Sequence, residues 1–227
     1  MGHSFGNHSP SENRLAELSR AYTVALLIGD EVAAETTIRD ALDSRLTMAE
    51  IDDEIIAPAL WYVGELWQRG EITVADEHLA TEISLRVLAL HREAHRLVAH
   101  RRRATVMLAA PSGERHIVAL EMVADLLRDA GYRVLNLGAD VPPAALALAA
   151  ERHKPDVIAM SATMPGGGDR MVIAADEIQE RVPEARFVVG GRALTSRLHA
   201  RPGMETCGRV TEVVETVDAV LKRAELN

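Results

Sequence analysis

The sequence has one cysteine, Cys207, few aromatic residues and no long apolar run. A single cysteine excludes an intramolecular disulfide and fits a reducing cytoplasm. No apolar stretch reaches the length of a membrane span, and the polar first dozen residues do not resemble a signal peptide. Positive charge is not in excess either, since the formal net charge is −9, which argues against general binding to nucleic acids or anionic membranes. We therefore expect a cytoplasmic protein.

The chain is nevertheless rich in aliphatic residues, with 48% of its 227 residues hydrophobic. This length allows one large domain or two small ones, each with a real core. Before about residue 101, apolar residues recur at helical spacing, which predicts amphipathic helices joined by short turns. A polar tail at 1–12 and a helical bundle at 13–100 are expected. The four predicted helices are Asn13–Ile28, Glu31–Asp43, Thr47–Arg69 and Thr73–Val98.

Local signals support these helix boundaries. Asp30 is a good N-cap for the second helix, and Thr47 with Glu50 forms the pattern of a capping box for the third. Pro58 lies inside the third helix and predicts a kink or break there.

After a basic hinge at Arg101–Arg103, the pattern changes to alternating strands and helices. This alternation predicts a parallel sheet with right-handed crossovers over residues 101–227. The fold class is thus a four-helix bundle followed by a flavodoxin-like or Rossmann-like α/β domain. The predicted strands are Thr105–Ala109, Arg133–Leu137, Val157–Met160 and Arg186–Val189, and the predicted helices are His116–Ala130, Ala144–Arg152, Arg170–Arg181 and Val210–Ala224.

The loop after the first strand carries Glu114 and His116. In such sheets ligands bind beyond the carboxyl ends of the strands. A carboxylate two residues before a histidine can accept its second ring N–H, which orients a histidine that binds metal. Taken alone, a surface histidine beside a helix-capping glutamate is the better interpretation.

The other loops at the same edge change this weighing. They contribute small and polar residues in a fixed order, and together with His116 they resemble the cobalamin-binding domain of methionine synthase, corrinoid methyl carriers and B12-dependent mutases. The resemblance implies that His116 is the lower axial ligand of cobalt and that the benzimidazole tail lies beside the sheet. The loop residues that carry it are Leu137, Gly138, Asp140, Val141, Ser161, Thr163, Gly190 and Gly191.

Two positions depart from the Asp-x-His-x-x-Gly pattern of that family. Glu114 replaces the aspartate and adds a methylene, and Ala119 replaces the glycine and adds a methyl group. Histidine ligation is compatible with both changes, although the tail position is expected to shift slightly.

A second pattern lies in the bundle, where Trp67 is followed after nine residues by Glu77 and His78. A core tryptophan and a glutamate favoured by the helix dipole explain each residue separately. The whole pattern, upstream of a cobalamin domain, resembles the adenosylcobalamin-dependent light sensors that repress carotenoid genes. In that family the tryptophan packs over the adenosyl group, and the Glu-His pair helps to hold it.

Two differences from those repressors shape the expectations. Only a short polar tail precedes the bundle, so direct DNA binding is not expected. Gln68 stands where the repressors have a histidine that ligates cobalt after light, which leaves His78 or water for the upper face. Stand-alone modules of this kind also resemble photocobilins, in which a bilin such as biliverdin binds beside cobalamin. Arg69, Arg86 and Arg92 are candidate partners of its propionates, or simply a solvated helix face.

The leading hypothesis is therefore a B12-dependent photoreceptor without a catalytic apparatus of its own. It binds adenosylcobalamin and responds to light through a conformational or oligomeric change, as a homo-oligomer (dimer or tetramer) with a regulatory protein partner. The alternative is a corrinoid methyl carrier of a methyltransferase system, which explains His116 but not the pattern from Trp67 to His78. A flavodoxin-like module for another ligand, such as a nucleotide, is the third hypothesis.

Overall fold

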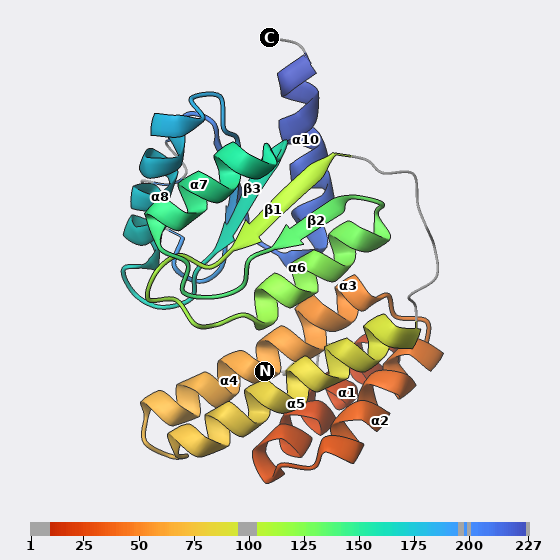
Figure 1. The fold of residues 1–227 in the computed structure, drawn as a ribbon. Helices are drawn as coiled ribbons and strands as arrows, with labels where there is room; N and C mark the ends of the chain where they lie inside the picture. Colours follow the sequence, from red (N-terminus) through yellow and green to blue (C-terminus); the bar gives the residue numbers. More distant parts are fainter. Residues whose placement is uncertain (1–9, 95–103, 195–197, 199–200, 226–227) are drawn as a thin grey trace, which may run out of the picture. The chain divides into compact units, whose positions relative to one another are not determined.

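The computed structural model describes residues 10–94, 104–194, 198 and 201–225. The chain divides into two compact units, residues 1–94 and residues 95–227. The first unit is helical and the second is built around a parallel sheet (Figure 1). This is the predicted fold class. The expected hinge at 101–103 lies outside the described residues.

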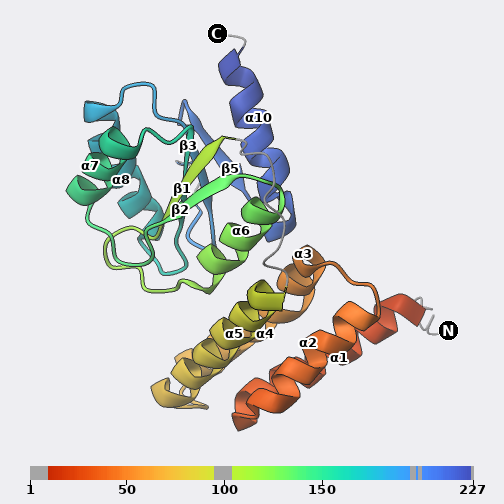
Figure 2. The ribbon, with the colours of Figure 1, turned by 45° about the vertical axis from the view of Figure 1, so that its right-hand side comes forward.

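The helical unit contains α1, α2, α4 and α5, with a short α3 and a π-helical turn before α4. The α1 helix begins three residues before the expected start at Asn13, so the polar tail is shorter than predicted. Figure 2 shows α1 beside α2 and α4 beside α5. The bounds are α1 Pro10–Ile28, α2 Glu31–Asp43, α3 Met48–Ile51, the π-helix Asp52–Ile56, α4 Ala57–Gln68 and α5 Val74–Ala94.

The predicted caps of this unit are confirmed. The Asp30 side chain accepts a hydrogen bond from the Ala33 N–H at 2.9 Å. Thr47 and Glu50 form both halves of a capping box. The predicted break at Pro58 takes another form, because a π-helical turn ends just before it. Proline has no N–H to give to the carbonyl four residues earlier. Just before it, the Ala57 N–H bonds to the carbonyl of Asp52, five residues earlier, as in a π-helix.

The helical unit is filled mainly by aliphatic side chains that are almost fully buried, such as Leu26, Ile55 and Leu88. Buried polar groups also occur in this unit. The Tyr22 hydroxyl donates to Ser84 Oγ at 3.0 Å, and Ser84 in turn donates to the Ala80 carbonyl. Burial is the main cause that raises the pKa of Tyr22 to about 12, and the nearby Asp52 carboxylate adds to it.

The second unit contains a five-stranded parallel sheet in the order β2-β1-β3-β4-β5. Four of these strands were expected and the fifth, Met204–Cys207, was not. It is a short edge strand of mixed polarity beside β4, so it lacks the apolar run by which buried strands are found. The strands are β1 Thr105–Ala109, β2 Arg133–Asn136, β3 Val157–Ser161, β4 Phe187–Gly190 and β5 Met204–Cys207.

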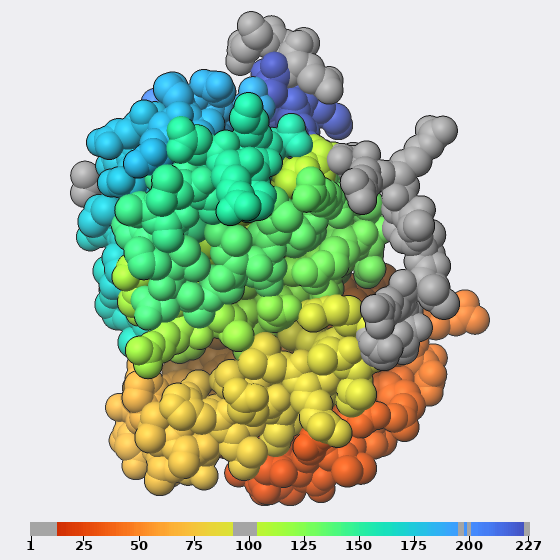
Figure 3. Space-filling model, in the orientation of Figure 1, coloured from red at the N-terminus to blue at the C-terminus, as the bar shows by residue number. Residues whose placement is uncertain are grey.

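Helices cover both faces of this sheet. The helices α7 and α8 pack on one face, against side chains such as Met107, Ile158 and Val189. The other face carries α6 and α10, against Leu108, Ala159 and others. The space-filling view shows the surfaces of α6 and α7, both in green, which cover opposite faces of the sheet (Figure 3). The bounds are α6 Val118–Asp129, α7 Pro143–His153, α8 Gly167–Arg181, a 3-10 turn Val210–Glu212 and α10 Val213–Glu225.

The strand order fixes where a ligand site can form. Chain connections leave β1 in one direction and β3 in the other, so the order reverses between these two neighbours. Ligands of such sheets bind at the carboxyl ends of the strands next to this reversal. The loops at 110–117 and 162–166 follow β1 and β3 and therefore flank the expected position.

Candidate functional site

The loop after β1 places a fully buried carboxylate beside an accessible histidine. Glu114 is 0% exposed, and its Oε1 lies 2.5 Å from His116 Nδ1 and 3.0 Å from the His116 backbone nitrogen. The His116 side chain is 43% exposed. Because Nδ1 is held by the carboxylate, Nε2 is the ring nitrogen from which a bond to a metal would form. This is the arrangement expected from the order Glu-x-His.

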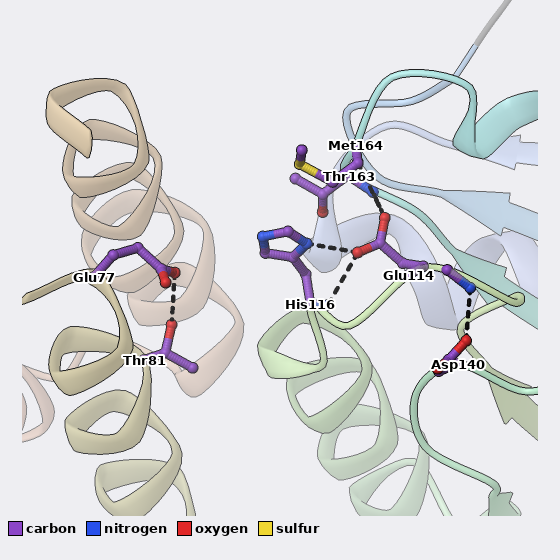
Figure 4. Close-up of polar contacts among 8 residues, drawn as sticks. Glu77, Thr81, Glu114, His116, Asp140, Thr163 and Met164 are labelled. Atoms are coloured by element: carbon purple, nitrogen blue, oxygen red, sulfur yellow. Dashed lines mark hydrogen bonds and ion pairs between the residues drawn. The ribbon is translucent and has the colours of Figure 1, made fainter. Parts of the chain in front are cut away.

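The second oxygen of Glu114 reaches across to the loop after β3. Its Oε2 accepts hydrogen bonds from the backbone N–H groups of Thr163, at 2.7 Å, and Met164, at 3.0 Å (Figure 4). Burial alone would raise the pKa of Glu114, but the bonds from His116 and from these two N–H groups outweigh it. They lower that pKa from 4.5 to about 2. Glu114 is thus an ionised acceptor that joins two loops.

The loop after β2 is tied to the same region. The Asp140 backbone N–H donates to the Glu114 carbonyl at 2.9 Å, and its carboxylate accepts from the Gly113 N–H at 2.7 Å. Asp140 has a left-handed backbone, with φ of 54°. The Ala110 N–H donates to the Gly138 carbonyl, and the Val141 N–H donates to the Ala110 carbonyl. The loop carrying His116 is therefore braced from both neighbouring strands.

Two further predicted residues of the site, one after β2 and one in α6, are partly exposed. Leu137 is a large apolar side chain that is 36% exposed. Ala119 lies in the first turn of α6 and is half-buried, where the family pattern has glycine. The helix itself starts only at Val118, two residues later than predicted, so that His116 stays on the loop.

The expected tail-channel residues lie at the ends of β3 and β4. Ser161 and Gly190 are the last residues of these strands rather than loop residues, and they face each other in the register. Ser161 is buried and Thr163 half-buried. Gly191 has φ of 93°, and a β-carbon there would lie 2.2 Å from the Ala162 carbonyl oxygen. Glycine at this position is therefore required by the fold itself.

The second group of predicted residues lies in the helical unit, at one end of the α4–α5 pair. Trp67 is 37% exposed near the end of α4, and Gln68 is the last residue of that helix. A short turn leads to α5, where Glu77 Oε2 lies 2.9 Å from His78 Nδ1. Glu77 Oε1 accepts a hydrogen bond from Thr81 at 3.2 Å (Figure 4). The His78 side chain is 73% exposed.

The residues at the carboxyl end of β1 fit a cobalamin. Among the described residues, no group of three or more His, Cys, Asp or Glu side chains is arranged to hold a metal ion. Cobalamin brings its own ring nitrogens to cobalt, so a single oriented histidine is the protein contribution that it needs. Within the same residues, none of the helices has the length and apolarity to cross a membrane.

Several residues of this site were not predicted. The Met164 N–H is a backbone donor, for which no residue type gives a signal. Asn136 ends β2 and bonds through its side chain to Glu121 and to the Gly138 N–H. Arg170 lies over the loops at 113 and 166. The sequence analysis placed it only as the first residue of the helix Arg170–Arg181.

Comparisons with known proteins agree with this arrangement. A family model described as a B12 binding domain matches residues 104–218, and a second model with that description matches residues 18–91. The HTH-type transcriptional repressor CarH of Myxococcus xanthus is 30% identical over 177 residues, which is 76% of this chain and 58% of the repressor. The chain thus spans less than two thirds of that relative.

Two further similar proteins come from Methanosarcina species. Trimethylamine corrinoid protein 1 of Methanosarcina acetivorans is 28% identical over 202 residues, which is 85% of this chain and 91% of that protein. The structure of a Methanosarcina barkeri monomethylamine corrinoid protein has the same fold. It superposes with a TM-score of 0.68 at 16% identity, over 92% of this chain and 99% of that one. The chain belongs to the B12-binding domain family, and these relatives support cobalamin as its ligand.

Proposed function

We propose that this protein is a B12-dependent photoreceptor that binds adenosylcobalamin with His116 as the lower axial ligand. The Glu114–His116 pair supports His116 as the lower ligand, because the carboxylate is buried and orients the imidazole through a 2.5 Å contact. A carboxylate in this place raises the basicity of the ring and fixes its direction. When bound, adenosylcobalamin supplies a cobalt–carbon bond that visible light cleaves.

The observation that carries the sensor function is the pattern of Trp67, Glu77 and His78. Trp67 is 37% exposed, which leaves apolar ring surface on which a flat ligand can pack. Glu77 is held by Thr81 and His78, which leaves its carboxylate in a defined position. A flat adenine packed on the indole would remove this apolar surface from water. Loss of that packing after light is the signal that we assign to Trp67.

The test is reconstitution with adenosylcobalamin in the dark, followed by illumination. We expect a change in absorbance and in elution volume on a sizing column. Trp67→Ala is expected to weaken retention of the adenosyl form, whereas Trp61→Ala, on the same helix, serves as the matched control. An absorbance and an elution volume that are the same before and after light would refute the sensor function.

The occupant of the upper face after light remains a prediction. His78 is a candidate ligand, so His78→Ala is expected to change the spectrum of the illuminated protein but not that of the dark protein. A bilin as second chromophore is also a prediction, tested by adding biliverdin before illumination. Arg69 and Arg86, expected near its propionates, already pair with glutamates in the helical unit. A homo-oligomer, a regulatory protein partner and a cytoplasmic location also stay predictions.

A corrinoid methyl carrier is the second candidate function. The observation in its favour is that the match to the trimethylamine corrinoid protein covers 91% of that relative's length. This function predicts tight binding of methylcobalamin and turnover of its methyl group by a partner methyltransferase. It also predicts that Trp67→Ala leaves the affinity for cobalamin unchanged. A light response that depends on Trp67 would decide against it.

A further inference from the structure

The side chain of Arg170 lies over two glycine turns at the carboxyl edge of the sheet. A β-carbon on Gly113 would lie 3.7 Å from Arg170 Nε, and one on Gly166 would lie 3.3 Å from Nη1. Both glycines have positive φ, so both turns present bare backbone to the guanidinium. Arg170 therefore bridges the loop that leads to His116 and the loop that follows Thr163.

The guanidinium has a donor that the described residues do not use. Arg170 Nε is buried and has no hydrogen-bond partner among them. The Gly113 N–H, on the turn against which Arg170 lies, donates to the Asp140 carboxylate. A buried charged donor without an acceptor is costly, and such a group in a native fold calls for a partner such as a water or a ligand.

The position of Arg170 relative to His116 indicates which part of a ligand it meets. Gly113 precedes His116 by three residues, and three residues of chain span at most about 11 Å. A corrin ring with its amide side chains, centred over the imidazole, reaches a comparable distance from cobalt. Arg170, which lies against Gly113, is therefore close enough to His116 to meet the rim of such a ring.

The layers of the fold separate Arg170 from the expected tail channel. Arg170 belongs to α8, which packs on the sheet face that carries Met160 and Val189. Ser161 and Gly190 follow these residues in their strands, and neighbouring strand residues point to opposite faces. The two expected channel residues therefore face the α6–α10 side, away from Arg170.

We propose that Arg170 donates hydrogen bonds to the carbonyl oxygens of amide side chains on the rim of the corrin ring. This inference rests on the proposed cobalamin site at His116 and adds a binding residue to it. The planar, always charged guanidinium suits this contact because its donors lie in a fixed fork. Glycine at 113 and 166 leaves room for it.

The experiment compares two ligands and three variants by absorbance titration of the full chain. The ligands are hydroxocobalamin and diaquocobinamide, which keeps the ring amides but lacks the nucleotide tail. Arg170→Met is expected to weaken both ligands about tenfold, or ~1.4 kcal/mol at 25 °C. Arg170→Lys, which keeps the charge but loses the fork, is expected to weaken them to a similar degree. The matched control is Arg181→Met, at the other end of α8, and we expect it to change neither affinity.

Each other outcome has a clear meaning. Unchanged affinities of both Arg170 variants would overturn the inference while leaving the cobalamin site intact. A loss confined to hydroxocobalamin would also overturn it, because the contact would then be with the phosphate of the tail. Absence of binding by the unmodified chain would instead refute the proposed function itself. Thermal unfolding without ligand checks the fold, and Arg170→Met is expected to unfold no earlier than the unmodified chain, since it removes an unsatisfied donor.

Discussion

The two compact units hold their candidate ligand-binding residues in different ways. In the α/β unit, Glu114 receives four hydrogen bonds from two loops, and Asp140 joins a third. In the helical unit, Trp67 and His78 stand on exposed helix surfaces, and Glu77 is held by His78 and Thr81, two neighbours on its own helix. The proposed lower face is thus fixed by backbone contacts between distant parts of the sequence. The proposed upper face is adaptable, which suits a side that must respond to a change of ligand.

The chain offers a separate reporter for each unit. Both tryptophans, Trp61 and Trp67, lie in the helical unit, so tryptophan fluorescence follows that unit alone. The only cysteine, Cys207, is buried in β5, so the rate at which its thiol reacts with a reagent follows opening of the α/β unit. Each prediction below uses one or both of these measurements.

The largest effect is expected at Gly191. Gly191→Ala would place a methyl group 2.2 Å from the Ala162 carbonyl oxygen at a φ that disfavours side chains. We expect a loss of about 3–5 kcal/mol from the α/β unit, read as fast reaction of Cys207. Gly138→Ala is the control, since it has a similar φ but open space around it, and should cost only about 1 kcal/mol. Equal effects of the two substitutions would contradict the steric argument.

The next effect is expected at Glu114. Glu114→Ala leaves the N–H groups of Thr163 and Met164 without their acceptor and releases His116. We expect a loss of about 3 kcal/mol from the α/β unit and weaker cobalamin binding. Glu151→Ala removes a carboxylate from an exposed ion pair of the same unit and should change stability by less than about 1 kcal/mol. Unchanged Cys207 reactivity in Glu114→Ala would argue that the two loops are held by other contacts.

Alkaline pH is expected to act on the helical unit. The folded pKa of Tyr22, about 12, lies above its ordinary value of 10. The folded unit therefore binds more protons than the unfolded chain between these values, so its stability is full below pH 10 and falls as the pH rises toward 12. A two-unit shift corresponds to roughly 3 kcal/mol. Tryptophan fluorescence should record this loss, and Tyr22→Phe should remove the pH dependence. If the variant and the unmodified chain lose stability in parallel, another group is responsible.

The smallest effect is expected at the capping box. Thr47→Ala removes the side-chain acceptor of the Glu50 N–H and should cost the helical unit about 1 kcal/mol. Thr36→Ala is the control, because its exposed hydroxyl only bonds back to the Val32 carbonyl within α2. Neither substitution should alter the reactivity of Cys207. A change there would show that the two units unfold together.

The sequence predicted most of this fold because its signals are local. The strand at Thr105–Ala109 is a continuous apolar run and was placed without error. The π-helical turn at Asp52–Ile56 was not foreseen, since Pro58 signals an irregular helix but not the form that the irregularity takes. The edge strand at Met204–Cys207 was missed because half of its residues are not buried.

The candidate site was predictable only in part, for a related reason. The order of loops along parallel strands brings Glu114 and His116 to one edge of the sheet, and their spacing in the chain places them in contact. The bonds from Thr163 and Met164 come from about 50 residues away and use backbone atoms. The unused donor of Arg170 depends on which atoms are buried around it. Such features arise from packing and leave no pattern in a single sequence.

The bracing of Glu114 has a consequence for how fast a ligand is captured. A histidine on an open loop would sample several rotamers, and binding would have to freeze them at a cost of about 1 kcal/mol. Here His116 is oriented before any ligand arrives, because the carboxylate that holds it is itself anchored to two loops. Most encounters between cobalamin and the protein then meet a correctly aimed nitrogen. The rate of association should therefore be limited by release of the benzimidazole tail that His116 replaces, rather than by rearrangement of the protein.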